Sequence, residues 1–529
     1  MRLSEIAADA HEGNAARLHD ETARRHGEAT AIEHHGTILT HEELRAESAA
    51  FAGGMADLGI DPGDVLLQYL PNCPAYLIGA LGALKAGVAV SPVNPQYRKR
   101  ELRYQLADTD AAAVLTHATL LEHLREALSG IDRSPTVIVV GSDDGGKTDS
   151  SDVRPFGTVR GEETLVQRTD DDVALLPYTS GTTGKPKGVR LTHRNFRAQM
   201  YSVLSGPNEV PDEAVRSLVW LPLYHITGFT HTAWQPLLRG GSVFLRSTAE
   251  WDAEAAMELI AREDITRFVG VTAMYVDMVE SEGFGASDLT SLEFAAEGGA
   301  KMSVPVQREF EDTAGVDVIE GYGLTETHGA THTQRNSTHG LRAGTIGQPL
   351  RMTGCKIVDE SGAAVPPGEE GELLVRGPHV MDGYHGMPDA TERAFTEGGY
   401  FRTGDIARRD AENYYEIVDR KKHMINSAGY NVYPSELEEL LAEHEAVAEG
   451  AVVGIPDERR NEVPKAYAVP ATGVEPGVDV TEAELKEFFL DRVAAYKHPR
   501  EIEFIEELPR TASGKIQKHR LGEQREEDQ

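Results

Sequence analysis

The chain has 529 residues, more than a single hydrophobic core usually accommodates, so we expect two or more domains. Its 86 acidic and 52 basic residues give a formal net charge of −34, which disfavours nucleic acid or an anionic membrane as a partner. Only 14 of the basic residues are lysines. Such an acidic, lysine-poor composition resembles that of halophilic proteins, where ions screen the self-repulsion, and adaptation to high salt is our hypothesis.

Cysteine placement and hydropathy exclude several further classes of protein. Cys73 and Cys355 are far apart and outside any metal-ligand spacing, so neither a disulfide framework nor a zinc site is expected. The first ten residues lack the apolar run of a signal peptide. The most membrane-like stretch, 74–93, contains Lys85 and three glycines, and it favours a helix followed by a buried strand. We expect a cytoplasmic protein without stable membrane insertion.

Residues 1–170 alternate helical patterns with short apolar runs, which is typical of a doubly wound parallel sheet. Residues 142–171 are rich in Asp, Gly and Ser, and we expect a solvated loop there. The apolar run 172–178 predicts a buried strand. The segment after it therefore lies at a strand end, where α/β sheets usually bind ligands.

Residues 178–189, YTSGTTGKPKGV, combine hydroxyl side chains, glycines and two lysines. Backbone N–H groups in such a loop can form an anion-binding nest, so the composition suits a polyphosphate. It is not a P-loop, because Thr179 and Pro186 stand where that motif needs glycine and a hydroxyl residue. It also fails the dinucleotide fingerprint, because two threonines follow Gly181. The alternative, a surface linker, normally lacks paired lysines and a buried strand before it.

The rest of the chain shows three patterns. Apolar runs at 217–222, 242–246 and 267–271 suggest a second sheet of similar build. Residues 350–419 are typical of short strands with Asp/Gly/Ser turns, as in a small β-barrel or β-sandwich. After residue 420 comes a polar connector and then roughly 100 residues with a helix, strand, helix, strand pattern, enough for a small separate domain.

Local signals place the elements of this last part. Pro434 opens a helix, apolar runs at 451–455 and 466–470 predict strands, and Thr481 caps a second helix that ends near residue 495.

The loop sequence YTSGTTGKPKGV resembles the phosphate-loop signature of the adenylate-forming superfamily: acyl-CoA synthetases, adenylation domains of peptide synthetases and firefly-type luciferases. Five motifs in that superfamily's order cover nearly the whole chain. The resemblance implies an α/β fold with a large N-terminal domain, 1–420, made of two α/β sheets and a β-barrel-like subdomain at about 345–420. A small, mobile α+β C-terminal domain, 421–529, follows.

In the phosphate loop, the resemblance implies contacts with ATP and, through Thr179, with Mg²⁺. The loop residues that it assigns to ATP are Thr179, Ser180, Gly181, Thr182, Thr183, Gly184 and Lys187.

Adjacent glycines follow the apolar run 292–296 and permit a flat ring to lie on the backbone. Gly298, Gly299 and Ala300 match the family's adenine-binding segment. Taken alone the pattern is weak, because Gly-Gly is common in turns.

The segment 321–327, GYGLTET, is the more specific motif. The resemblance assigns Gly321, Tyr322, Gly323 and Thr325 to the nucleotide, with the Tyr322 ring for adenine stacking and the Thr325 hydroxyl for the α-phosphate. Glu326 would supply a carboxylate to Mg²⁺, which prefers oxygen ligands and substrate phosphates.

His225 ends the segment WLPLYH. A lone histidine there is more often structural, but the resemblance places it beside the acyl pocket and the thiol path. Phe229 and Trp234 could line the same pocket, although a core position is at least as plausible for Trp234. Residues 330–333 should also shape the pocket.

Asp405, just beyond a glycine turn, matches the family residue that accepts hydrogen bonds from both ribose hydroxyls, and Arg420 matches its partner at the ribose. Lys422 matches the hinge about which the C-terminal domain rotates between two half-reactions. Lys515, in PRTASGK, matches the adenylation catalyst, an ammonium between the carboxylate and the α-phosphate.

The resemblance also implies a path for CoA. The residues that it assigns to CoA are Ala428, Gly429, Tyr430, His498 and Arg500. For the last two, a plain basic helix end is almost as good an interpretation.

The implied enzyme is an AMP-forming acyl-CoA synthetase with catalytic residues Lys515, Thr325, Glu326 and His225, using ATP, Mg²⁺ and CoA. A carboxylic acid and ATP would give acyl-AMP and pyrophosphate, and the acyl group would then pass to CoA. The motif wording favours a medium- to long-chain fatty acid. The alternatives are a stand-alone enzyme that loads an acyl or amino acid onto a carrier protein, or a nucleotide-sensing scaffold. A homodimer is left open.

Overall fold

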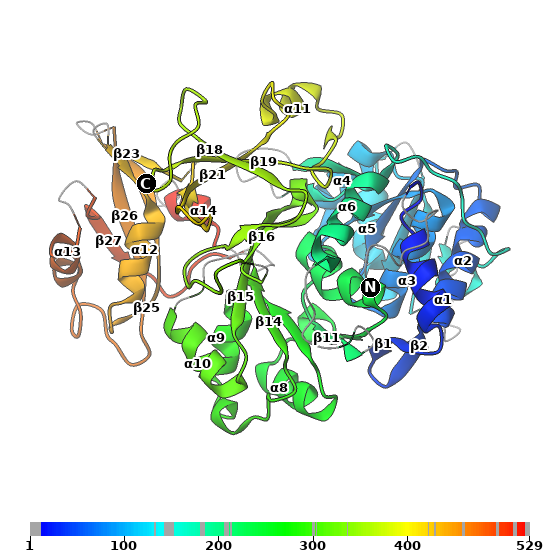
Figure 1. The fold of residues 1–529 in the computed structure, drawn as a ribbon, viewed down its shortest axis with the longest axis horizontal. Helices are drawn as coiled ribbons and strands as arrows, with labels where there is room; N and C mark the ends of the chain where they lie inside the picture. The colour runs from blue at the N-terminus through cyan, green and yellow to red at the C-terminus, as the bar shows by residue number, and fades with distance from the viewer. Residues whose placement is uncertain are drawn as a thin grey trace.

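The computed structural model describes residues 12–131, 134–141, 153–179, 186–205, 211, 214–298, 302, 304–335, 337–421, 423–427, 430–457, 461–493, 497–510 and 516–523. Two large α/β bodies, a β-rich part and a C-terminal part follow one another around the molecule (Figure 1). Among the described helices, none has the length and apolar composition needed to cross a bilayer.

The first sheet draws mainly on the N-terminal third of the chain. Its strands are β3 (Val65–Tyr69), β4 (Ala89–Pro92), β5 (Ala113–His117), β6 (Thr136–Val140), β7 (Val153–Pro155), β8 (Val173–Leu175), β9 (Tyr178–Thr179), β10 (Lys187–Thr192) and β20 (Gly383–Tyr384). The order is β20-β10-β8-β4-β3-β5-β6-β7, with β9 beside β10. Strands β4, β3, β5, β6 and β7 pair in parallel, which confirms the predicted doubly wound sheet.

Alternate side chains of β3 reach opposite faces of this sheet, as the period of a strand requires. Leu66 packs in a core with residues of α2 (His41–Asp57) and α3 (Pro74–Ala86). Leu67 packs in another core with residues of α4 (Lys99–Thr109) and α5 (Leu121–Leu128). Helices therefore cover both faces.

The membrane-like stretch 74–93 forms α3 followed by β4, as predicted. Pro74 occupies the first turn, where its missing N–H costs nothing, and Gly87 ends the helix with φ +75°. Lys85 is only 1% exposed, and its ammonium lies 2.6 Å from the Asp20 carboxylate. This buried ion pair explains how a charged residue fits inside the fold.

The expectation of a solvated loop at 142–171 is partly wrong. From residue 153 the chain forms β7 and then packs on α2, where Val159 is 4% exposed and the Gly161 N–H bonds to the Ala50 carbonyl. The polar composition of this segment did not indicate that it packs on α2, because backbone groups make most of the contact.

The second sheet contains the predicted strands near 217–222, 242–246 and 267–271. Its strands are β1 (Thr30–His34), β2 (Thr37–Thr40), β11 (Arg216–Val219), β12 (Ser242–Leu245), β13 (Arg267–Gly270), β14 (Phe294–Gly298), β15 (Val318–Leu324), β16 (Gly329–Thr333) and β17 (Gln348–Pro349). The order is β17-β16-β15-β14-β13-β11-β12-β1-β2. The N-terminal β1 and β2 join this sheet and not the first, because Ile32 of β1 pairs in parallel with Val243 of β12.

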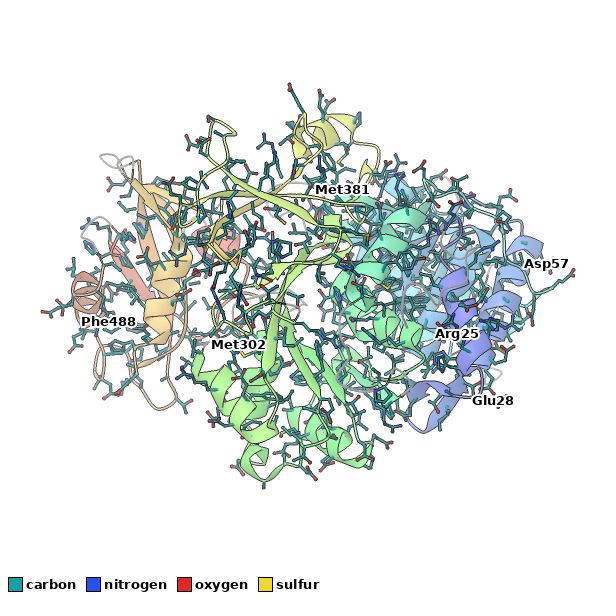
Figure 2. All side chains as sticks on the ribbon, in the orientation of Figure 1. Arg25, Glu28, Asp57, Met302, Met381 and Phe488 are labelled. Atoms are coloured by element: carbon teal, nitrogen blue, oxygen red, sulfur yellow. The ribbon has the colours of Figure 1, made fainter. Side chains whose placement is uncertain are left out.

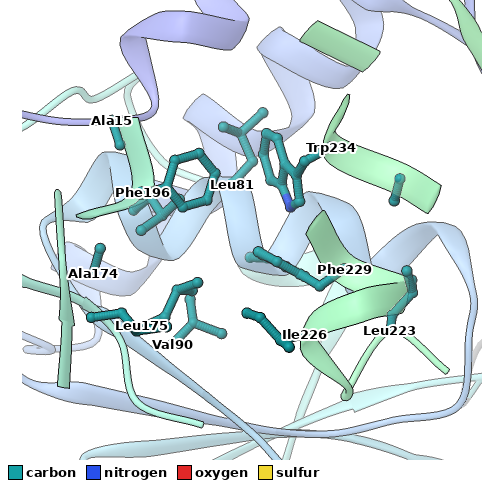
Figure 3. Close-up of a cluster of buried hydrophobic side chains, with 14 of the residues drawn as sticks. Ala15, Leu81, Val90, Ala174, Leu175, Phe196, Leu223, Ile226, Phe229 and Trp234 are labelled. Atoms are coloured by element: carbon teal, nitrogen blue, oxygen red, sulfur yellow. The ribbon is translucent and has the colours of Figure 1, made fainter. Parts of the chain in front are cut away.

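The largest core lies between the two sheets. Val219 and Val243 of the second sheet share it with α3, α6 (His193–Leu204), α7 (Gln235–Arg239) and a π-helical segment, η6 (Gly228–Trp234). The rings of Phe196, Phe229 and Trp234 pack there (Figure 3). On the other face of the second sheet, α8 (Ala253–Arg262), α9 (Thr272–Glu280) and α10 (Val304–Ala314) pack against Leu218 and Phe244.

The β-rich part and the C-terminal part each have a sheet of their own. The first contains β18 (Gly354–Val358), β19 (Gly371–Arg376), β21 (Phe401–Arg409) and β22 (Tyr415–Arg420), in that order and antiparallel. The second contains β23 (Ile425–Ser427), β24 (Tyr430–Val432), β25 (Val447–Asp457), β26 (Asn461–Pro470) and β27 (Glu501–Phe504). The remaining helices are α1 (Arg17–His26), α11 (Pro388–Ala394), α12 (Pro434–Ala442), α13 (Glu482–Leu490) and α14 (Lys518–Glu523).

The predicted helices and strands after residue 420 are present, but the second helix, α13, ends at Leu490 and not near residue 495. Pro434 opens α12, and the Thr481 hydroxyl caps α13 by accepting from the Glu484 N–H. Across the connector, the Asp419 carboxylate at the end of β22 accepts a hydrogen bond of 3.0 Å from the Ser435 N–H in the first turn of α12. The two parts therefore meet directly beside the connector.

Buried histidines make the fold sensitive to acid. Burial lowers the pKa of His328 and of His332 to about 3, so both are neutral in the folded protein. The unfolded chain binds a proton at each below pH 6.5, so stability should fall as pH drops from 6.5 towards 3, by about 1 kcal/mol per pH unit for each histidine. Urea unfolding at pH 7.5, 6 and 5 measures this. A free energy of unfolding that does not change with pH would contradict this. So would a variant with both His328 and His332 replaced by glutamine whose free energy of unfolding has the same pH dependence as that of the wild type.

Candidate active site

Two glycines that were predicted to bind the nucleotide lie on neighbouring strands. Gly298 of β14 pairs with Gly321 of β15, and neither has the positive φ that requires glycine. Among the described residues, a Cβ at either position would meet no heavy atom closer than 3.8 Å. Contacts with the described residues therefore do not require glycine at these two positions.

Tyr322 connects this strand with the β-rich part. Its hydroxyl donates a short hydrogen bond to Asp405 Oδ2, and Arg420 Nε lies 3.0 Å from Asp405 Oδ1. Asp405 and Arg420 face each other in the β21–β22 ladder. Burial and the Asp405 charge hold the pKa of Tyr322 well above its ordinary value, so its hydroxyl stays a donor.

Asp405 itself is 1% exposed, whereas the Arg420 side chain is 43% exposed. The Tyr322 hydroxyl and the Arg420 guanidinium thus help to fix the carboxylate, and each of its oxygens can accept more than one hydrogen bond. Three residues that the sequence assigned to one nucleotide come together from two sheets.

A second cluster joins the first sheet to the motif 321–327. The Tyr384 hydroxyl donates to Glu326 Oε1 at 2.9 Å, and the Lys187 ammonium lies 4.4 Å from the centre of the Tyr384 ring. Burial and the Glu326 charge raise the pKa of Tyr384, which keeps the phenol protonated. The Met381 N–H also bonds to the Glu326 carbonyl at 2.8 Å. Figure 2 labels Met381 where the β-rich part meets the helices of the first body.

Tyr384 was not predicted from the sequence, because a Gly-Tyr dipeptide in a strand of two residues has no periodicity or motif spacing to mark it. It holds Glu326 through its hydroxyl and Lys187 through its ring. Thr325 and Glu326 lie in a 3₁₀ turn, η9 (Thr325–Thr327), directly after β15. Thr179 pairs with Lys187 across β9 and β10.

His225 and Phe229 line one small pocket, and its role as the acyl pocket stays a prediction. Its other walls are Tyr76, Val90, Pro92, Leu175, Pro177, Leu223, Tyr224 and Ile226. Gly228 permits the tight turn behind it, because a Cβ there would lie 2.2 Å from the Pro222 carbonyl oxygen. Trp234 is 2% exposed and packs edge-on against Phe196, so it is a core residue.

Only some of the site residues predicted in the C-terminal part lie among the residues that the structure describes. His498 Nε2 lies 2.9 Å from an Arg500 guanidinium nitrogen, beside β27. Tyr430 lies in β24. The predicted residues outside the described part of the chain are Ser180, Gly181, Thr182, Thr183, Gly184, Gly299, Ala300, Lys422, Ala428, Gly429 and Lys515.

Comparisons with known proteins decide the family. The model of the AMP-binding enzyme family matches residues 19–385, and that of its C-terminal domain matches residues 436–515. The chain belongs to the AMP-binding enzyme family. It is an AMP-forming acid–thiol ligase of the acyl-CoA synthetase type.

Several relatives resemble the ligase over nearly its full length. It is 37% identical to a feruloyl-CoA synthase from Amycolatopsis sp, over 94% of this chain and 96% of the relative. It is 33% identical to a long-chain-fatty-acid CoA ligase from Bacillus subtilis (strain 168), over 96% and 94%.

Solved structures agree on the fold of the ligase. It superposes on the anthranilate CoA ligase AuaEII in complex with anthranoyl-AMP with a TM-score of 0.87 at 26% identity, covering 98% of both chains. ATP-bound MatB from Rhodopseudomonas palustris gives 0.85 at 28% identity, covering 96% of this chain and 98% of that one.

The Tyr384→Phe substitution tests the second cluster. It keeps the ring beside Lys187 but removes the hydrogen bond to Glu326, and a bond to a charged group contributes about 1.5–3 kcal/mol. We expect the rate of acyl-AMP formation to fall by about tenfold or more, with a higher Mg²⁺ concentration at half-maximal rate. Tyr400→Phe, whose ring lies beside Lys356 and Arg376, is the control. Equal rates for both variants would contradict the prediction.

Proposed function

We propose that the ligase converts a carboxylic acid and ATP to acyl-AMP and pyrophosphate, and then transfers the acyl group to the CoA thiol with release of AMP. The observation that supports this most is the convergence of Tyr322, Asp405 and Arg420, with Tyr322 on the strand whose Gly321 pairs with Gly298. A mixed anhydride makes the carbonyl a better electrophile than the free carboxylate.

Residue roles follow from the motifs and the geometry. We propose that Asp405 and Arg420 bind ribose, that Tyr322 stacks on adenine and that Thr325 contacts the α-phosphate. Lys515 stabilises charge that develops during the displacement. The segment 179–187 surrounds the β- and γ-phosphates.

Magnesium fits the donor set. The Glu326 carboxylate and the Thr179 hydroxyl are hard oxygen donors, and Mg²⁺ typically takes few protein ligands together with substrate phosphates. When bound, the ion neutralises charge on the phosphates. Tyr384 restrains Glu326 for that role.

The acid should have an apolar body, since the pocket beside His225 has mainly apolar walls. A medium- to long-chain fatty acid is the candidate that the motif wording favours. An aryl acid is the second candidate, because the feruloyl-CoA synthase is 37% identical and three aromatic residues, Tyr76, Tyr224 and Phe229, are among the pocket walls.

We also propose that the chain divides at about residue 420 and that its C-terminal part rotates about Lys422 between the half-reactions. Residues 428–430 and the pair His498 and Arg500 would then serve CoA. The alternative acyl acceptor is the thiol of a separate carrier protein. We propose a cytoplasmic location, without a nucleic acid partner and without stable membrane insertion. A homodimer is the oligomeric state left open.

An AMP-release assay tests the reaction. The acids are acetate, butyrate, octanoate, palmitate, benzoate and ferulate, each with and without CoA. AMP release that requires both acid and CoA supports the ligase, and the preferred acid separates the fatty from the aryl candidate. Pyrophosphate exchange without CoA turnover would instead favour a carrier protein. Neither reaction with any acid would contradict the proposal.

Adaptation to high salt is a separate proposal, supported by the net charge of −34. Acidic side chains such as Glu28 and Asp57 project at the rim of the molecule (Figure 2). Screening of their repulsion should raise the melting temperature by roughly 5 °C between 0.2 and 2 M KCl. Differential scanning fluorimetry measures this, and a flat or falling curve would contradict it.

A further inference from the structure

Helix α4 contacts the chain on both sides of the predicted phosphate loop. Before the loop, the Tyr178 hydroxyl donates to Asp108 Oδ2 at 2.5 Å. After it, the Pro186 carbonyl accepts a hydrogen bond of 2.8 Å from the Tyr104 hydroxyl. Tyr104 and Asp108 are four residues apart on α4 and therefore share one face of the helix. One helix face thus holds both loop ends.

The two tyrosines also contact each other. The rings of Tyr104 and Tyr178 pack edge to face with centroids 6.3 Å apart. Burial, followed by the hydrogen bond and charge of Asp108, holds the pKa of Tyr178 far above its ordinary value. The phenol is therefore a permanent donor, and the carboxylate has a fixed partner.

The pairing of β9 with β10 also holds the two ends of the loop together. Lys187 pairs with Thr179 and Gly188 with Tyr178, so β9 and β10 bring the two loop ends side by side. Packing is tight at Gly188, because a Cβ would lie 3.0 Å from the Tyr178 ring and 3.2 Å from His385 Cβ.

His385 ties β10 to α4 a second time. Its N–H donates to the Gly188 carbonyl at 2.8 Å, and its Nε2 lies 3.0 Å from the Asp108 carbonyl oxygen. This oxygen can only accept, so Nε2 carries the proton. Helix α4, β10 and the segment after β20 form one connected unit around the loop ends.

We propose that α4 is a positioning element for the triphosphate, with Tyr104 and Asp108 fixing the spacing of the two ends of segment 180–185. The inference rests on the proposed function, in which that segment binds the β- and γ-phosphates. Holding Tyr178 and Pro186 fixes β9 and β10 relative to each other, and with them the predicted phosphate contacts Thr179 and Lys187. Acyl transfer from acyl-AMP to CoA involves no triphosphate and does not depend on this unit.

Two hydroxyl deletions test the proposal. Tyr178→Phe should weaken ATP binding by about tenfold, because its bond goes to a carboxylate, and Tyr104→Phe by about 3- to 10-fold. Calorimetric titration with ATP and with AMP measures this, and AMP affinity should stay within twofold. Acid-dependent pyrophosphate exchange should fall in parallel, whereas thioester formation from synthetic acyl-AMP and CoA should not.

Matched control variants distinguish an effect on the position of the loop ends from a general loss of stability. Tyr69→Phe removes an equivalent hydroxyl bond, to the Tyr97 carbonyl at 2.7 Å, without touching the loop ends. Asp108→Asn keeps an acceptor and should retain most ATP affinity, whereas Asp108→Ala should behave like Tyr178→Phe.

The outcomes are distinct. If Tyr104→Phe and Tyr178→Phe bind ATP like Tyr69→Phe, or if both half-reactions fall equally, α4 is not a positioning element for the triphosphate. If the wild-type chain binds no ATP and catalyses no exchange with any acid, the proposed function itself fails.

Discussion

Replacing Lys515 by alanine is expected to lower acid-dependent ATP–pyrophosphate exchange by about 100- to 1000-fold, the usual effect of removing one preorganised donor from a developing charge. The ammonium is needed only while the carboxylate displaces pyrophosphate. Thioester formation from synthetic acyl-AMP and CoA should therefore change little. Exchange kinetics and a thiol-consumption assay measure the two half-reactions separately.

Lys518→Ala is the control for this experiment. Lys518 lies three residues further along, and its ammonium pairs with Glu438 at 2.7 Å inside the C-terminal part. It should leave exchange within a fewfold of wild type. Equal losses in both half-reactions for Lys515→Ala would show that the lysine supports the fold or CoA binding and not adenylation.

Asp405→Asn should produce the second large effect. The substitution keeps the size of the side chain but replaces a charged acceptor by a neutral amide beside Tyr322 and Arg420. Hydrogen bonds to charged groups contribute about 1.5–3 kcal/mol, so two weakened ribose contacts imply at least a 10- to 100-fold rise in KM for ATP. Steady-state kinetics and ATP titration by calorimetry measure it.

Asp359→Asn is the matched control. Asp359 lies at the end of β18, where its carboxylate accepts hydrogen bonds from the Ser361 and Ala363 N–H groups in an exposed turn. The control should alter neither KM nor affinity. An Asp405→Asn enzyme with unchanged KM for ATP would contradict the ribose assignment.

Candidate site residues could be named from the sequence where one local motif contains them, as with Gly321, Tyr322 and Glu326. Asp405 and Arg420 were named only through the family resemblance, and the structure pairs them across β21 and β22. Tyr384 could not be predicted, because its role arises from a contact with Glu326, 58 residues earlier in the chain.

The fold shows the same limit. Alternating patterns identified α3, β4, β11 and α13, since period and capping are local properties. Sheet membership is not local. β1 has few apolar residues, and nothing in its own sequence shows that it pairs with β12 and not with the strands that follow it in the chain.

This long-range pairing affects how the chain can fold during synthesis. The contact between His34 and Leu245 spans 211 residues, which take roughly 10–40 s to synthesise at typical rates. The first sheet gains its last strand later still, since β20 pairs with β10, and the adjacent His385 contacts Asp108 of α4 across 277 residues. Until residue 245 has emerged, β1 and β2 have no partner strand in the second sheet, and until residue 384 has emerged the edge of β10 that pairs with β20 stays exposed. Such unpaired edges invite aggregation, so we expect the nascent chain to depend on chaperones until residue 385 has emerged.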